Sequence, residues 1–165
     1  MTKTSNKRKG NSEENKCAKI LGEWIFDDRD ALQRHLTSGA QKDVFIGDIV
    51  PQKRLRWKNF ILNIEVKKGY PNDIPDFFSH SKLVGWFKKA WEQSQESEYQ
   101  KIVLLICQFH NKKRKLVMTN YCAKKCVPAL VIPVRDIGIY SYIYYLNDLL
   151  KHNFEEIFEV EDYDI

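Results

Sequence analysis

Two acids and a lysine, near two short apolar segments, are the residues of this chain best suited to chemistry: Asp48, Glu65 and Lys67. Residues 60–67 alternate between apolar and polar side chains, so Glu65 and Lys67 share one face of a predicted strand. Carboxylates are ligands that Mg²⁺ accepts, and an ammonium group beside them can offset charge that develops on a phosphate. We expect Asp48, Glu65 and the backbone carbonyl of Val66 to bind a divalent metal, and Lys67 to hold or polarise the attacking water.

A less specific interpretation competes with this one. An isolated acid-any-lysine triplet on a strand is usually an ordinary surface ion pair, and Asp48 could simply end a strand. We favour the catalytic interpretation because the acid, the gap and the triplet follow one another on consecutive predicted strands. They also follow a predicted helix with Glu14 at the edge of its apolar stripe, in a basic chain.

The hydrophobic pattern predicts a layered fold of strands and helices around these residues. The expected helices cover residues 13–26, a short helix or helical turn over 28–37, then 81–97 and 138–151, and the expected strands cover 44–50, 60–67, 102–109, 115–119 and 129–133. This order indicates an α/β or α+β fold, with a central mixed β-sheet flanked by helices.

Composition indicates one soluble domain that meets a polyanion. The 165 residues are 43% hydrophobic and carry a net charge of +5, which becomes +11 without the six acids after Asn153. We expect a basic flexible arm over 1–12, a single domain over 13–153 and an acidic tail over 154–165. A well-solvated surface is the alternative explanation of the charge. Without a long apolar run or an apolar leader, we expect a cytoplasmic protein with no membrane partner.

Several basic clusters could grip backbone phosphates. They lie in the N-terminal arm and in two segments that flank the candidate site. The residues that we expect to bind DNA are Lys7, Arg8, Lys9, Lys53, Arg54, Arg56, Lys68, Lys112, Lys113 and Arg114.

The spacing of Cys107, His110, Cys122 and Cys126 has some similarity to a zinc site. Cys107 lies in an apolar segment predicted to be a buried strand, and its side chain faces away from that of His110. We therefore expect no zinc here. Four cysteines in a chain of this size also do not indicate a disulfide framework.

With these residues in place, the chain resembles the PD-(D/E)xK nucleases, and among them the archaeal and phage Holliday-junction resolvases. The basic segment Lys7–Glu14 is similar to the K-G-x-x-x-E opening of those resolvases, and Thr37–Gly39 resembles their S-G loop. The resemblance implies a restriction-endonuclease-like core. It also implies that Glu14 completes the metal site and that Ser38 lies near the scissile phosphate. Two positions depart from the pattern: Gly47 replaces the usual proline, and Asn15 stands where arginine is common.

The resemblance implies an endodeoxyribonuclease that uses Mg²⁺, or Mn²⁺ in its place, and no organic cofactor. The expected substrate is branched DNA, in recombination, repair or phage DNA processing. Because opposite strands of a junction must both be cut, we expect a homodimer. Two alternatives remain open: a restriction- or repair-type endonuclease acting on duplex DNA, and a non-catalytic nucleic-acid-binding protein that retains a degenerate nuclease core.

Overall fold

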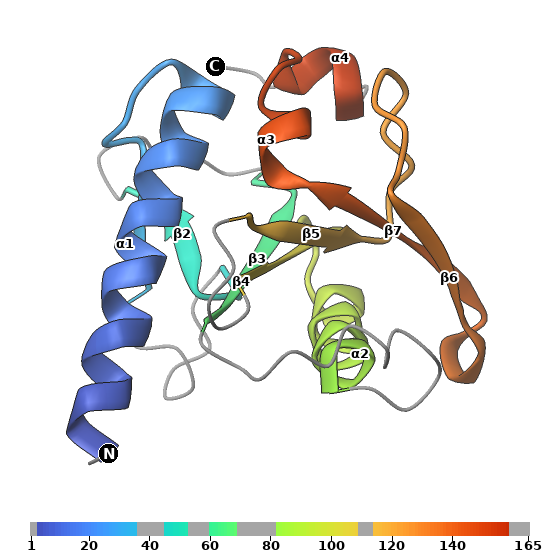
Figure 1. The fold of residues 1–165 in the computed structure, drawn as a ribbon, viewed down its shortest axis with the longest axis horizontal. Helices are drawn as coiled ribbons and strands as arrows, with labels where there is room; N and C mark the ends of the chain where they lie inside the picture. Colours follow the sequence, from blue (N-terminus) through green and yellow to red (C-terminus); the bar gives the residue numbers. More distant parts are fainter. Residues whose placement is uncertain (1–2, 36–44, 53–59, 69–81, 109–113, 159–165) are drawn as a thin grey trace.

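The computed structural model describes residues 3–35, 45–52, 60–68, 82–108 and 114–158 (Figure 1). Its elements, in chain order, are α1 (Lys3–Phe26), β1 (Leu32–Arg34), β2 (Ile49–Pro51), β3 (Leu62–Lys68), α2 (Lys82–Glu96), β4 (Ile102–Gln108), β5 (Leu116–Thr119), β6 (Leu130–Val134), the 3-10 helix η3 (Arg135–Ile137), β7 (Ile139–Tyr145), α3 (Leu146–Leu149) and α4 (Phe154–Phe158). In these residues, no helix is both long and apolar enough to cross a membrane.

The described strands form one mixed sheet in the order β1-β2-β3-β4-β5-β7-β6. β3 and β4 are parallel, and α2 connects them, while the neighbouring pairs are antiparallel. A parallel pair needs such a crossover, because a tight turn cannot join strands that run the same way. The expected mixed sheet with flanking helices is confirmed.

Both faces of the sheet are covered by apolar side chains. Alternate residues of β4 point to opposite faces: Leu104 and Ile106 pack with α1, α3 and α4, whereas Val103 and Leu105 pack with α2. Figure 1 shows α2 on the opposite side of the sheet from α3 and α4. This two-sided burial explains why β4 is almost entirely apolar in sequence.

The helix expected over residues 138–151 is wrong. The chain instead forms β7 (Ile139–Tyr145) and only then the short helix α3. Ile143 packs against the α2 face, and Tyr144 packs against the opposite face. β-branched and aromatic residues suit a strand covered on both sides, and the apolar residues of this segment serve both faces of the sheet.

The short helix or helical turn expected over residues 28–37 is also wrong. Leu32–Arg34 forms β1, which pairs with β2 through the register Leu32↔Pro51 to Arg34↔Ile49. Three residues carry too little local preference to decide their own structure, and the neighbouring strand supplies the hydrogen bonds. The strand expected over 44–50 is shorter in the structure, where β2 begins only at Ile49.

At both ends of the chain, residues that were expected to lie outside the packed domain form helices. Helix α1 runs without interruption from Lys3, so the backbone of residues 3–12, which were expected to form a basic arm, is helical. At the other end, α4 buries Phe154, Ile157 and Phe158 in the core. The packed domain therefore extends past the expected boundary at Asn153 and includes the start of the expected acidic tail.

Candidate active site

Asp48 lies where β2 and β3 separate. The two strands share the register pair Ile49↔Ile64, and the backbone N–H of Asp48 donates to the carbonyl of Ile64 at 2.7 Å. Farther along β3, the N–H of Val66 donates to Asp48 Oδ2 at 2.8 Å. The Asp48 carboxylate thus takes the place of a backbone carbonyl of a neighbouring strand. The acid is therefore fixed to the residue between Glu65 and Lys67.

The Lys67 ammonium forms ion pairs with both carboxylates that are predicted to bind a metal. Its Nζ lies 2.6 Å from Glu65 Oε2 and 3.2 Å from Asp48 Oδ2. The three side chains are mostly buried, with 16–23% of each exposed. Burial and the Asp48 charge raise the pKa of Glu65 above its usual value. Burial would lower the pKa of Lys67, but the two carboxylates outweigh it and raise that pKa, so the ammonium stays charged.

Glu14 of α1 belongs to the same electrostatic environment. Its carboxylate lies 3.8 Å from Arg34 Nη1, and the same Nη1 donates to Asn11 Oδ1 at 3.2 Å. Burial and the charge of Asp48 raise the pKa of Glu14. The structure thus brings together three acids and two cations, so the cluster carries one excess negative charge when all are ionised.

Gly47 positions Asp48 in a way that the usual proline could not. Its φ is +99°, whereas a proline ring fixes φ near −65°. A Cβ at this position would lie 2.7 Å from both Asn63 Oδ1 and the carbonyl oxygen of Ile64. His35 holds the segment from the other side: its backbone N–H donates to the carbonyl of Asp48 at 2.8 Å. The glycine is therefore a local requirement of this backbone.

The neighbouring acid, Glu13, has a different environment. Only 2% of its side chain is exposed, and it forms ion pairs with Lys115 at 2.8 Å and Lys68 at 2.5 Å. Burial alone would raise its pKa, but hydrogen bonds and charge from the two lysines together lower it. Lys68, predicted to bind DNA, thus already neutralises a buried acid while a third of it remains exposed.

The structure places only some of the other predicted residues. Arg114 is exposed, and its guanidinium carbon lies 5.4 Å from the centroid of the Tyr145 ring. Lys7, Arg8 and Lys9 lie in helix α1, but their side chains are outside the described part of the structure. The following predicted residues lie wholly outside it: Ser38, Lys53, Arg54, Arg56, His110, Lys112 and Lys113.

The described residues offer oxygen donors from different chain segments. Among them, no group of three or more His, Cys, Asp and Glu side chains is arranged to hold a metal by itself. Asp48 and Glu65 are a two-carboxylate donor set, which suits a hard ion such as Mg²⁺ that keeps several waters. Of the cysteines considered for zinc, Cys107 is buried with its pKa raised by burial to about 12, and Cys122 is exposed.

Sequence reasoning missed three residues of this region. Arg34 was missed because β1 was expected to be helical. Asn63 shares the face of Glu65 and Lys67, so strand alternation could have identified it; it is fully buried and donates to the carbonyl of Ala90 in α2 at 2.8 Å. Gln100 gave no sequence signal, because its partners are distant backbone groups.

Asp48, Glu65 and Lys67 on this mixed sheet are the residues through which the sequence resembles the PD-(D/E)xK nucleases. A family model described as "Phage putative PDDEXK endonuclease" matches residues 5–160, and the chain belongs to this family. The match covers Glu14, Asp48, Glu65 and Lys67, and it extends beyond α4. Searches of curated proteins and of solved structures found no match.

Proposed function

We propose that the protein is a Mg²⁺-dependent endodeoxyribonuclease that cuts branched DNA. The observation that carries this proposal is the position of the Lys67 ammonium between the carboxylates of Asp48 and Glu65. Membership of an endonuclease family supports the reaction class. Neither observation identifies branched DNA, which rests on the resemblance of the segment Lys7–Glu14 to junction resolvases.

Asp48, Glu65 and the carbonyl of Val66 are the proposed metal ligands, with Glu14 as a further one. The N–H of Val66 points toward Asp48. Since the N–H and C=O of one strand residue point the same way along the sheet, the Val66 carbonyl faces the same gap between β2 and β3. Burial, and after it the charge of Asp48, raises the pKa values of Glu14 and Glu65 more than the nearby cations lower them. A divalent cation fits this donor set and this excess of negative charge.

When bound, the ion supplies charge neutralisation and acidifies a coordinated water. Lys67 holds the attacking water and, with its persistent positive charge, stabilises the charge that develops on the phosphate. Arg34 offers a second fixed cation beside Glu14. We assign Ser38 a contact with the scissile phosphate on the resemblance alone.

The basic character of the body supports a DNA substrate. Arg114 presents an exposed guanidinium, and the Arg34 guanidinium lies beside Glu14 at the site. Such groups contact backbone phosphates, so binding should weaken steeply as salt increases. We also propose that the lysines and arginines of the segments 7–9, 53–56 and 112–113 bind phosphates.

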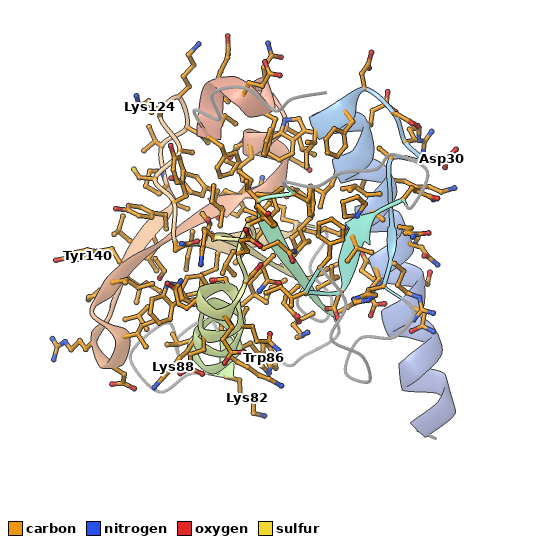
Figure 2. All side chains as sticks on the ribbon, turned by 180° about the vertical axis from the view of Figure 1, so that it is seen from behind. Asp30, Lys82, Trp86, Lys88, Lys124 and Tyr140 are labelled. Carbon is orange, nitrogen blue, oxygen red and sulfur yellow. The ribbon has the colours of Figure 1, made fainter. Side chains whose placement is uncertain are left out.

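A homodimer would supply the two active sites that a junction requires. Tyr142 and Tyr144 of β7 pack within the core of one subunit. Tyr140 is 61% exposed, Val131 is 44% exposed and Leu130 is 38% exposed on the β6–β7 ribbon. Figure 2 shows Tyr140 pointing away from the molecule. We place the subunit contact at the edge of β6, where a second copy could extend the sheet.

A cleavage panel tests this proposal. The protein is incubated with a four-way junction, a linear duplex of the same sequence and a single strand, each with Mg²⁺ or with EDTA. Symmetric cuts in the junction alone, lost in EDTA, are expected. Cleavage of the linear duplex at one sequence would contradict a junction substrate and indicate a restriction-type endonuclease. Binding without any metal-dependent cleavage would favour a non-catalytic protein.

A further inference from the structure

Gln100 uses its whole side-chain amide to connect two distant segments. The residue is fully buried and lies just before β4. Its Oε1 accepts from the N–H of Ile46 at 2.6 Å, and its Nε2 donates to the carbonyls of Ile46 at 2.9 Å and Leu62 at 2.7 Å. A reversed amide would place the oxygen against two carbonyls, so the hydrogen bonds fix its orientation.

Both partners lie close to the proposed metal ligands along the chain. Ile46 precedes Asp48 by two residues, and Leu62 precedes Glu65 by three. Gln100 offers Ile46 one donor and one acceptor, as a residue of an adjacent strand would. β2 and β3 pair directly at Ile49↔Ile64. At Ile46, which precedes β2, the Gln100 side chain takes the place of a strand partner.

The position of the Asp48 carboxylate depends on the backbone that Gln100 holds. Gly47, between Ile46 and Asp48, has a positive φ and no side chain to anchor it. The segment is held on its two sides, by Gln100 at Ile46 and by His35 at Asp48. Losing the Gln100 bonds would leave the N–H and carbonyl of half-buried Ile46 and the carbonyl of buried Leu62 without this partner, and the segment would move to reach water or other groups.

We propose that Gln100 is a positioning residue that sets the separation of Asp48 and Glu65, and with it the affinity for the divalent metal. This inference rests on the proposed metal-dependent function. It differs from a purely structural role because metal binding requires the two carboxylates to converge, whereas folding requires only that the buried polar groups be satisfied. Outer partners that orient metal ligands typically contribute 10- to 100-fold to metal affinity.

The test measures Mn²⁺ binding to the full chain without DNA, from the electron paramagnetic resonance signal of free Mn²⁺. Gln100→Met keeps the side-chain volume and removes the three hydrogen bonds. Asn120→Ala is the matched control, because Asn120 also bonds two backbone groups, accepting from Val103 N–H at 2.8 Å and donating to the Lys101 carbonyl at 3.0 Å. Its partners belong to the β4 side of the sheet and not to Asp48 or Glu65.

We expect Gln100→Met to raise the Kd for Mn²⁺ about tenfold or more. At saturating Mn²⁺, its cleavage rate should stay within about threefold of wild type, and Asn120→Ala should leave the Kd unchanged. A folded Gln100→Met protein with wild-type Mn²⁺ affinity would overturn the proposal, as would an equal loss of affinity in Asn120→Ala. If Gln100→Met does not fold, Gln100→Asn, whose shorter amide cannot span both segments, is judged by the same criteria.

The same measurements test the proposed metal-dependent function independently of the role of Gln100. A wild-type protein that binds no Mn²⁺, or that binds it equally well after Asp48→Asn, has no metal site at Asp48. That result is obtained before any Gln100 variant is compared, and it overturns both inferences. Normal Mn²⁺ binding that depends on Asp48, together with an unaffected Gln100 variant, overturns only the positioning role.

Discussion

The carboxylate of Asp48 accepts a hydrogen bond from the backbone N–H of Val66, at 2.8 Å. Asp48, which immediately precedes β2, thus accepts a hydrogen bond from the backbone of β3 between Glu65 and Lys67. This contact joins the two parts of the motif directly, through the backbone of β3. It also means that a change at Asp48 affects the backbone of β3 as well as the donor set.

Replacing Asp48 by Asn or Glu65 by Gln should abolish cleavage and leave DNA binding largely intact. Each change removes one negative charge while nearly preserving shape, so metal affinity falls without disturbing the basic surface. We expect a loss of at least about 100-fold in cleavage rate, measured on the preferred substrate alongside gel-shift affinity. Lys67→Met should also lose activity, while metal still binds. Equal loss of binding and cleavage would mean that the acids are structural.

Gly47→Ala should destabilise the protein by about 3 kcal/mol, because it combines a strained positive φ with a steric clash. Urea unfolding would measure the change. Gly138→Ala is the matched control for φ alone, since φ is +69° there and a Cβ would meet nothing within 4 Å. It should cost about 1 kcal/mol. Gly85→Ala, in helix α2 with open space around it, should instead stabilise by up to about 1 kcal/mol. Equal costs at Gly47 and Gly138 would contradict the clash.

Glu13→Gln should destabilise the protein in a pH-dependent way. The folded-state pKa of Glu13 lies below its usual value of 4.5, so ionised Glu13 contributes stability above pH 4.5, and this contribution is lost as the pH falls below 4.5. We expect a cost of about 2 kcal/mol at pH 7, shrinking below about pH 4.5. Unfolding of wild type and variant in urea, compared across pH 3–7, measures this difference.

Glu23→Gln is the control for the Glu13 experiment. Glu23 lies on the same helix, but it is exposed and only 4.0 Å from exposed Arg29. Its replacement should change stability by less than about 0.5 kcal/mol. A Glu13 variant as stable as the Glu23 variant at pH 7 would contradict a stabilising role for the buried pairs with Lys68 and Lys115.

A chain that ends at Asn153 should fold poorly, whereas one that ends at Phe158 should keep wild-type stability. The shorter chain loses three buried side chains, Phe154, Ile157 and Phe158. Each large apolar deletion costs several kcal/mol, so together they exceed the margin of a typical domain. Thermal unfolding followed by circular dichroism distinguishes the two. The 1–158 form is then the correct one for testing whether the last acids weaken DNA binding.

Val131→Lys should convert the proposed homodimer to a monomer. A charge on the exposed face of edge strand β6 opposes pairing with a second copy. Light scattering coupled to size exclusion measures the mass. Lys82→Ala, at an exposed position of α2 (Figure 2), should leave the dimer intact. A monomeric wild-type protein, or a dimer unaffected by Val131→Lys, would contradict the assigned contact.

Strand alternation was enough to predict that Glu65 and Lys67 share a face, and the order of acids predicted their meeting with Asp48. Helix α2, with one clear helical period, and β4, a short continuous apolar run, were also predicted correctly. β1 and β7 were not. β1 has three residues, and its structure depends on pairing with β2. β7 is apolar on both faces, so its pattern fits a buried helix as well as a strand.

The missed site residues share one physical property: their partners are far away in sequence. Gln100 bonds Ile46 at a separation of 54 residues, and Arg34 bonds Asn11 at a separation of 23. No local pattern encodes such pairs. The conformation of Gly47 was equally hidden, because the composition of a segment does not reveal the sign of φ.

The end of helix α1 packs against the segment that carries α3 and α4. Trp24 Nε1 donates to the carbonyl of His152 at 2.8 Å, and its ring meets Phe154 edge-on at 5.3 Å. A chain in which residues 146–158 are unfolded lacks this surface at Trp24, whereas Glu14 still has its partner Arg34 in β1. We therefore expect the end of α1 to become protected from proteolysis only when residues 146–158 have folded against it.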